Sequence, residues 1–348
     1  MKRTLFIVTL LLFHSNAFSQ SLVIKAQSKE TNQRRLEVRV KPFIDLYFFV
    51  YKLSSGSEKV PDIVGFPQAV EAARQTPLTS TLVDLILFRC ENAADAVEAF
   101  SQFPETHKTR KGEIIPLRER AIHLAKSLAA IEKSFLEQVW PQHKVVIEQA
   151  AARIVQTLGP KEQEVFAYMT KHLGMENANY LVPVYLVAET PWPGGFTMWG
   201  KSSSSTRGIC LLSVEANKGS QLLESLLHEA IHALDLETKG TGNILMELQK
   251  RLLKAGYTKS DRDFEQAAHF LVFIQTAETV RRMLDPSHRH YGEVKGVYAR
   301  VPLVAKVELP TWIAYLDGKI SLEEALNRIV EGFIKARNES SPSKIQSQ

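Results

Sequence analysis

Apolar residues recur at helical spacing along most of the chain up to Gly174, which indicates a helix-rich first half. Proline and glycine residues divide this pattern into separate helices, because neither residue type continues a helix well. Two short β-like runs come first, at 22–24 and 36–40, and the strongly apolar stretch 43–53 is compatible with a buried helix or a buried strand. The predicted helices then occupy 66–103 (as two or three helices), 117–140, 145–158 and 161–173.

The pattern changes after residue 180, where strand-like segments replace the helical periodicity. The elements predicted next are strands over 180–188 and 208–214, a Gly-, Ser- and Trp-rich loop over 190–208, and helices over 220–240 and 263–283. A last helix begins at the capping box formed by Ser321 and Glu324. The chain is therefore expected to be a mostly helical α+β protein with a small sheet, and residues 336–348 are expected to be a disordered polar tail.

The helix predicted over 220–240 contains His228-Glu229-Ala230-Ile231-His232, which matches the H-E-x-x-H motif. His228 and His232 are four positions apart, so their imidazoles leave one helix face a turn apart. This spacing suits two nitrogen ligands of a single Zn²⁺ ion. Glu229 points about 100° away from His228, where it is placed to take a proton from activated water and pass it to a leaving amine.

These residues resemble the zincin superfamily of metallopeptidases. The resemblance implies a zincin-like fold with the small sheet beside the H-E-x-x-H helix, one Zn²⁺ per chain, and hydrolysis of peptide or amide bonds in a peptide or protein substrate. It also implies that the strand before the helix, here 209–213, is a sheet edge to which extended substrate adds. Zincins often stabilise the oxyanion with a Tyr or His near the metal, and Tyr291 and His290 are the candidates by position.

Catalytic zinc needs a third protein ligand and one open position. The metzincin pattern, with a third His six residues after the second, is excluded because Thr238 stands at that place. Resemblance to the gluzincins instead implies a Glu from a later helix, and the helix predicted over 263–283 offers Glu265, His269 and Glu278.

Among these three, Glu278 is favoured as the third ligand. It shares an apolar helical stripe with residues 267, 271 and 274, and an unpaired carboxylate is costly to bury. His269 and Glu265 remain as alternatives on a different face of the helix. A salt bridge to Arg281 or Arg282 on the next turn would also account for a buried Glu278.

The first residues have the pattern of a signal peptide. Lys2-Arg3 is the charged region, residues 5–13 are apolar, and Ala17-Phe18-Ser19 is a small-x-small cleavage site before Gln20. We therefore predict a signal peptide over 1–19 and a secreted or periplasmic protein. A helix-rich N-terminal region would occupy 20–159 and the zincin-like catalytic region 160–335. No other apolar run is long enough for a transmembrane helix, so no stable membrane insertion is expected after cleavage.

Charge and cysteine content narrow the function further. The net charge is +5 and becomes +3 once Lys2 and Arg3 are removed with the predicted signal peptide, which is too small to argue for nucleic-acid binding. Cys90 and Cys210 would form a disulfide or remain two buried thiols, and the sequence leaves both open. The alternative to a peptidase is a non-catalytic zinc-binding or scaffold protein on a zincin-like fold, which a closed fourth ligand position would indicate.

Overall fold

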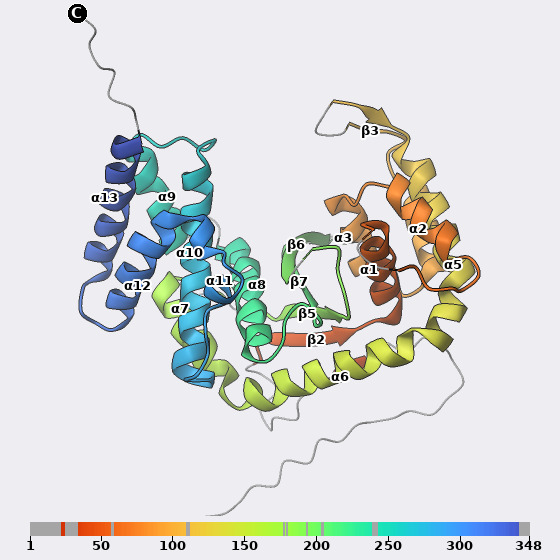
Figure 1. The fold of residues 1–348 in the computed structure, drawn as a ribbon, viewed down its shortest axis with the longest axis horizontal. Helices are drawn as coiled ribbons and strands as arrows, with labels where there is room; N and C mark the ends of the chain where they lie inside the picture. Colours follow the sequence, from red (N-terminus) through yellow and green to blue (C-terminus); the bar gives the residue numbers. More distant parts are fainter. Residues whose placement is uncertain are drawn as a thin grey trace, which may run out of the picture. The chain divides into compact units, whose positions relative to one another are not determined.

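The structure is a computed structural model, drawn in Figure 1. It describes residues 22–24, 34–56, 59–108, 112–176, 178, 180–192, 194–202, 205–238 and 243–340. The signal peptide predicted over 1–19, with its cleavage site, lies outside these residues, as does the part of the predicted tail from residue 341 onward.

The chain divides into two compact units. The N-terminal unit comprises the chain up to Pro160 together with Leu181–Lys218, and the C-terminal unit comprises Lys161–Tyr180 and the chain from Gly219 onward. The boundary predicted after residue 159 lies beside the first of these divisions. The segment Leu181–Lys218, expected in the catalytic region, instead belongs to the N-terminal unit, so the sheet and the H-E-x-x-H helix lie in different units.

A five-stranded sheet organises the N-terminal unit, with strand order β1-β2-β5-β7-β6. The three central strands run parallel, and the two outer strands pair antiparallel with their neighbours. The register of the β5 and β7 pair sets Val184 opposite Cys210. The strands are β1 (Leu22–Ile24), β2 (Leu36–Val40), β5 (Val182–Val187), β6 (Gly195–Ser202) and β7 (Ser205–Ser213).

Two expectations about this sheet are wrong. The loop expected over 190–208 contains strand β6, whose Phe196 lies opposite Leu211 and whose Met198 lies opposite Ile209. These cross-strand apolar pairs outweigh the glycine-rich composition that suggested a loop. Because β6 covers β7, the segment 209–213 is interior to the sheet and is not the edge expected by resemblance to zincins.

Helix α1 (Pro42–Ser54) resolves the ambiguous apolar stretch as a helix buried on nearly all sides. A segment surrounded by protein shows no amphipathic period, which is why periodicity did not decide. Helices α2 (Phe66–Gln75) and α5 (Leu117–Gln138) lie against α1 and against each other (Figure 1). The other elements of this unit are α3 (Ser80–Arg89), α4 (Ala93–Ser101), the hairpin of β3 (His107–Lys108) and β4 (Ile114–Ile115), and α6 (Trp140–Thr157).

A polar cluster in the N-terminal unit is centred on Asp45, whose side chain is fully buried. The Asp45 carboxylate on α1 accepts hydrogen bonds from the Ala188 N–H at 2.6 Å and from His143 Nδ1 on α6 at 2.6 Å. Cys90 and Cys210 are buried thiols, so of the two states left open by the sequence the reduced one is found.

The C-terminal unit is helical in its described residues, and α10 (Arg262–Thr279) is its central element. This helix contacts α7 (Glu162–Leu173), α8 (Ser220–Thr238), α9 (Ile244–Lys254) and α12 (Leu309–Leu316) (Figure 1). It continues into a π-helical turn over Val280–Leu284. The remaining elements are α11 (Tyr291–Val294), two further short helical turns (Tyr298–Arg300 and Val304–Glu308) and α13 (Leu322–Ser340).

These elements confirm a mostly helical α+β protein with a small sheet. Ser321 caps α13 as predicted, its hydroxyl accepting from the Glu324 N–H at 3.1 Å. The same helix continues to Ser340, beyond the boundary expected for the tail at residue 335. Among the described residues, no helix combines the length and the apolar character needed to cross a bilayer.

Candidate metal centre

Helix α8 carries both histidines of the H-E-x-x-H motif into the C-terminal unit. Its apolar face is fully enclosed, with Leu226, Leu227 and Ile231 entirely buried. His228 is 5% exposed and Glu229 is 7% exposed, whereas His232 is half-buried. The apolar burial anchors the helix, so the two imidazoles hold the facing positions that their spacing predicts.

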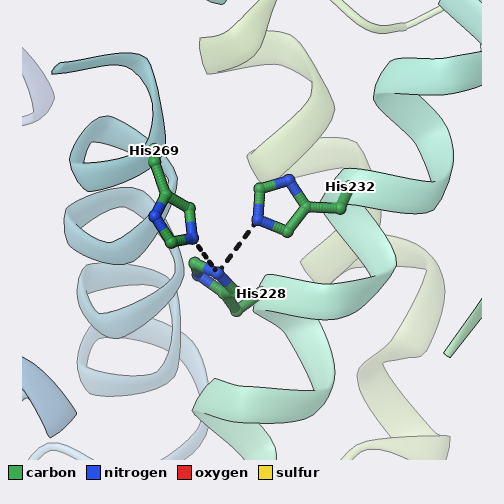
Figure 2. Close-up of side chains that lie close together, drawn as sticks. All are labelled: His228, His232 and His269. Atoms are coloured by element: carbon green, nitrogen blue, oxygen red, sulfur yellow. Dashed lines mark hydrogen bonds between the residues drawn. The ribbon is translucent and has the colours of Figure 1, made fainter. Parts of the chain in front are cut away.

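A third histidine, His269 on α10, completes a compact group with the two on α8. The Nε2 atom of His228 lies 3.0 Å from Nε2 of His232 and 3.1 Å from Nε2 of His269. Figure 2 shows the three rings converging from the two helices. One ligand atom from each histidine lies within 4.8 Å of the other two, which is the arrangement of a candidate metal site.

The donor set and its spacing fit a zinc ion. Zinc–nitrogen bonds of about 2.0–2.1 Å in tetrahedral geometry place ligand nitrogens about 3.3 Å apart. The 3.0 and 3.1 Å separations at His228 are close to that value. Imidazole nitrogen is a common ligand for zinc, and also for copper, nickel and iron, so the geometry points to a transition metal without selecting one.

The three imidazoles are held in the neutral form that a metal requires. Burial, followed by the neighbouring histidines, lowers the pKa of His228 well below its usual value. Burial and the nearby His269 lower the pKa of His232 to about 3. Loss of hydration around its ring also lowers the pKa of His269, although this residue keeps an exposed edge. Each ring therefore has an unprotonated nitrogen available near neutral pH.

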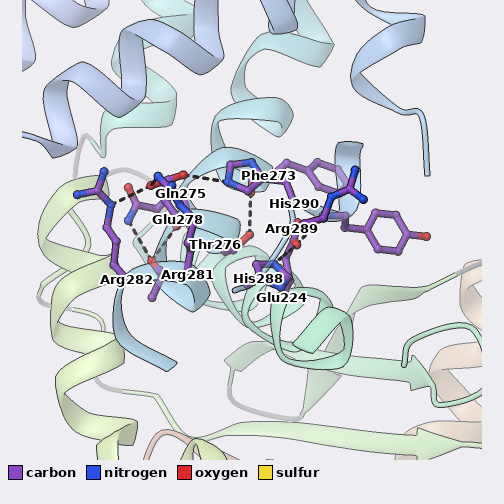
Figure 3. Close-up of polar contacts among 12 residues, drawn as sticks. Glu224, Phe273, Gln275, Thr276, Glu278, Arg281, Arg282, His288, Arg289 and His290 are labelled. Carbon is purple, nitrogen blue, oxygen red and sulfur yellow. Dashed lines mark hydrogen bonds and ion pairs between the residues drawn. The ribbon is translucent and has the colours of Figure 1, made fainter. Parts of the chain in front are cut away.

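The structure does not bring Glu278, the favoured third ligand, to the two histidines of α8. Its carboxylate is fully buried and accepts from Arg281 Nη2 at 2.6 Å, Arg282 Nε at 2.9 Å and His290 Nε2 at 2.9 Å. Figure 3 shows this cluster at the end of α10. The alternative considered from the sequence, pairing with Arg281 or Arg282, is the one found, and both arginines take part.

Helical geometry explains why His269 and Glu278 cannot both face the candidate metal site. They are nine residues apart on α10, which corresponds to roughly half a turn in azimuth and about 13 Å along the axis. His269 faces α8, so Glu278 faces the opposite side. The buried stripe was correctly identified from the sequence, and its carboxylate is hydrogen-bonded to Arg281, Arg282 and His290. The other alternative, Glu265, also lies on α10, and its side chain is outside the described part of the chain.

Tyr291 is linked to the histidine group through ring contacts with Phe273. The Phe273 ring on α10 is 4.0 Å from the His228 ring and 5.0 Å from the His269 ring, between centroids. Tyr291 stacks on Phe273 with centroids 6.3 Å apart and is half-buried. Burial, then the nearby Glu224, raises the pKa of Tyr291. Tyr291 is thus a neighbour of the site, whereas His290 turns away from it to bind Glu278.

Two acidic residues of α8 lie about one turn from the motif histidines, Glu224 before His228 and Asp235 after His232. Asp235 accepts a hydrogen bond from the Asn243 side chain at the start of α9. Glu224 accepts from His288 Nε2 and from the Tyr291 N–H, each at 2.7 Å. Both carboxylates therefore connect α8 to neighbouring segments.

No protein-family model matches this chain, and comparisons with curated proteins and with solved structures give no match either. What the protein does is therefore inferred from the residues of the site. His228 and His232 could be predicted from the sequence because their spacing within one helix is local. His269 was one of three candidates, and only the packing of α10 on α8 distinguishes it from the other two.

Proposed function

We propose that the protein is a zinc-dependent hydrolase of peptide or amide bonds, with Zn²⁺ held by His228, His232 and His269. The observation that carries this proposal is the convergence of three histidines from two helices, with Glu229 next to His228 in the sequence of α8. Bound there, zinc would act as a Lewis acid towards a carbonyl oxygen and would activate water as a nucleophile.

Glu229 would supply the acid–base chemistry. Its position on α8 is about 100° from His228 and about 60° from His232, so it belongs to the stripe next to the ligands. A carboxylate at this place accepts the proton of the attacking water and delivers it to the departing amine nitrogen. Tyr291 remains a candidate for stabilising charge on the substrate oxygen, since its ring stacks on Phe273, whose ring also contacts that of His228.

Ligand number and exposure favour catalysis over a structural metal. A structural zinc site is closed by four protein ligands, whereas catalytic zinc keeps an open position. Among the described side chains, no fourth His, Cys, Asp or Glu joins the group of three. His269 is exposed to solvent, so a substrate has a side from which to approach. A non-catalytic zinc-binding or scaffold protein would be indicated by a fourth protein ligand, and the described residues offer none at this group.

The proposed compartment rests on the sequence of the first residues. The charged, apolar and small-x-small regions of residues 1–19 support an exported protein, secreted or periplasmic. Its proposed peptide or protein substrates would then be met outside the cytoplasm. N-terminal sequencing of the protein from its native compartment tests export. A first residue at Gln20 supports it, and an intact Met1 contradicts it.

Replacing Glu229 with Gln tests the proposed chemistry, because the variant keeps the size of the side chain and removes the base. The zinc-loaded wild type is expected to cleave members of an unbiased peptide library. Glu229→Gln should retain its zinc and lose about 10²–10⁴-fold in rate. Unchanged cleavage by Glu229→Gln would contradict the catalytic role, and loss of zinc from it would mean that Glu229 is itself a ligand.

A further inference from the structure

A short non-helical segment between α10 and α11 makes side-chain contacts with both helices that carry the histidines. His288 and His290, two residues apart in this segment, each bond a carboxylate of a different helix. His288 points to α8 and His290 points to α10, as their carboxylate partners show. Figure 3 shows both histidines with Glu224 and Glu278.

The contacts with α8 lie about one helical turn before His228. The Glu224 carboxylate, 1% exposed, accepts from His288 Nε2 and from the Tyr291 N–H, each at 2.7 Å. The Ser220 hydroxyl lies 2.8 Å from His288 Nδ1, which fixes the orientation of the imidazole ring. A further tie runs from Gln221 Nε2 to the Arg289 carbonyl at 2.7 Å.

The contacts with α10 are equally buried. Glu278 accepts from His290 Nε2 at 2.9 Å, and the Tyr298 hydroxyl lies 3.3 Å from His290 Nδ1. Both His290 and Glu278 are at most 5% exposed at the side chain. Hydrogen bonds to a buried carboxylate are directional and are strengthened by low local polarity. The segment therefore joins α8 to α10 and fixes the distance between them. Apolar packing alone is non-directional and would restrain this distance less.

That separation matters because the metal site is divided between the two helices. His228 and His232 come from α8 and His269 comes from α10, so any shift between the helices changes the ligand spacing directly. Metal–ligand distances tolerate only about ±0.2 Å. We infer that Glu224 and Glu278 are positioning residues of the metal centre, acting through His288 and His290 as a brace between its two helices. This inference rests on the proposed function and assigns Glu278 a role outside the coordination sphere.

Zinc affinity, measured by competition with a chromophoric chelator, tests the brace. Glu224→Gln and Glu278→Gln are each expected to bind zinc about 10–100-fold more weakly than the wild type while keeping its circular dichroism spectrum. Glu323→Gln is the matched control. It removes a carboxylate of α13 that pairs with Arg251 on an exposed face, and its zinc affinity should be unchanged. Wild-type affinity in both folded test variants would overturn the inference.

A second measurement uses the wild type and does not depend on the folding of a variant. Because coupling between two sites is reciprocal, zinc binding must stabilise the brace as much as the brace stabilises zinc binding. The Tyr291 amide, which is bonded to Glu224, should exchange with deuterium roughly 5–150-fold more slowly when zinc is present. The Glu324 amide at the start of α13 should be unaffected.

The outcomes separate this inference from the proposed function. A wild-type protein that binds no zinc overturns both. A protein that binds zinc tightly, yet shows no change at the Tyr291 amide and no loss of affinity in Glu224→Gln or Glu278→Gln, keeps its metal centre and loses the brace.

Discussion

His228 and His269 are 41 positions apart in the sequence, and their Nε2 atoms face each other at 3.1 Å. Each comes from a different helix of one compact unit, and His232 brings a third nitrogen to the same place from the α8 side. The pair shows how the site is built. A local motif provides two imidazoles, and the packing of α10 on α8 provides the third.

The buried carboxylate of Glu278 should make stability depend on pH in the acid range. Burial alone would raise its pKa. The hydrogen bonds from His290, Arg281 and Arg282 together have the larger effect and lower the pKa from 4.5 to about 2. Because the pKa is lower in the folded state, ionised Glu278 stabilises the protein fully above pH 4.5, its pKa in the unfolded chain. This stabilisation is lost as the pH falls towards 2. The charge-dependent contribution is on the order of 3 kcal/mol.

Comparing wild type with Glu278→Gln isolates this contribution. The difference in their free energies of unfolding, from urea titrations without metal, should be constant above about pH 4.5 and narrow below it. A difference that stays constant down to about pH 2.5 would contradict the ionised, paired state of Glu278.

Gly292, the residue after Tyr291, should not tolerate a side chain. A Cβ atom at this position would lie 2.3 Å from Cε1 of Tyr298, inside the contact distance of carbon atoms. Gly292→Ala is therefore expected to lower the free energy of unfolding by about 1–3 kcal/mol, as overpacking does. Gly159→Ala is the control, because its Cβ would meet no atom of the described residues within 4 Å. Equal thermal stability of the two variants would show that the Tyr298 ring moves aside freely.

His143 and Asp45 should stabilise the N-terminal unit most at low pH. Burial alone would lower the pKa of His143. The hydrogen bond and the charge of Asp45 together have the larger effect, so the net pKa lies above the ordinary value of 6.5. Because the pKa is higher in the folded state, protonated His143 contributes its full stabilisation below about pH 6.5. This stabilisation is lost as the pH rises through the folded-state pKa. His143→Asn should cost about 1–3 kcal/mol, and more at about pH 5.5 than at about pH 8.5. A cost that grows with pH would have the wrong sign.

The predictable parts of this molecule are those set by residues close in sequence. The spacing of His228 and His232 and the cap at Ser321 are local, and both are found as predicted. Strand β6 was missed because its apolar alternation is interrupted by glycine, and its pairing with β7 decides the matter. The helical state of α1 was undecided because burial on all sides removes the periodic signal.

The sequence ranked His269, the proposed third ligand, below Glu278 for a different physical reason. The sequence placed Glu278 on a buried stripe, which is correct, and a buried carboxylate does need a partner. What the sequence lacked was the partner's identity, because His290 reaches Glu278 only after the chain turns back through a π-helical segment. His269 has an exposed edge and lies off the apolar stripe, so periodicity ranked it lower although it faces the two histidines of α8.

The metal content of single histidine variants tests the central claim most directly. Elemental analysis of protein purified without chelator should give about one zinc per chain for the wild type and for His123→Ala, an exposed histidine of α5. His228→Ala, His232→Ala and His269→Ala should each lose that zinc, since each removes one of three ligands. Full zinc retention by His269→Ala would contradict the three-histidine centre, and retention by all three variants would remove the metal from this site altogether.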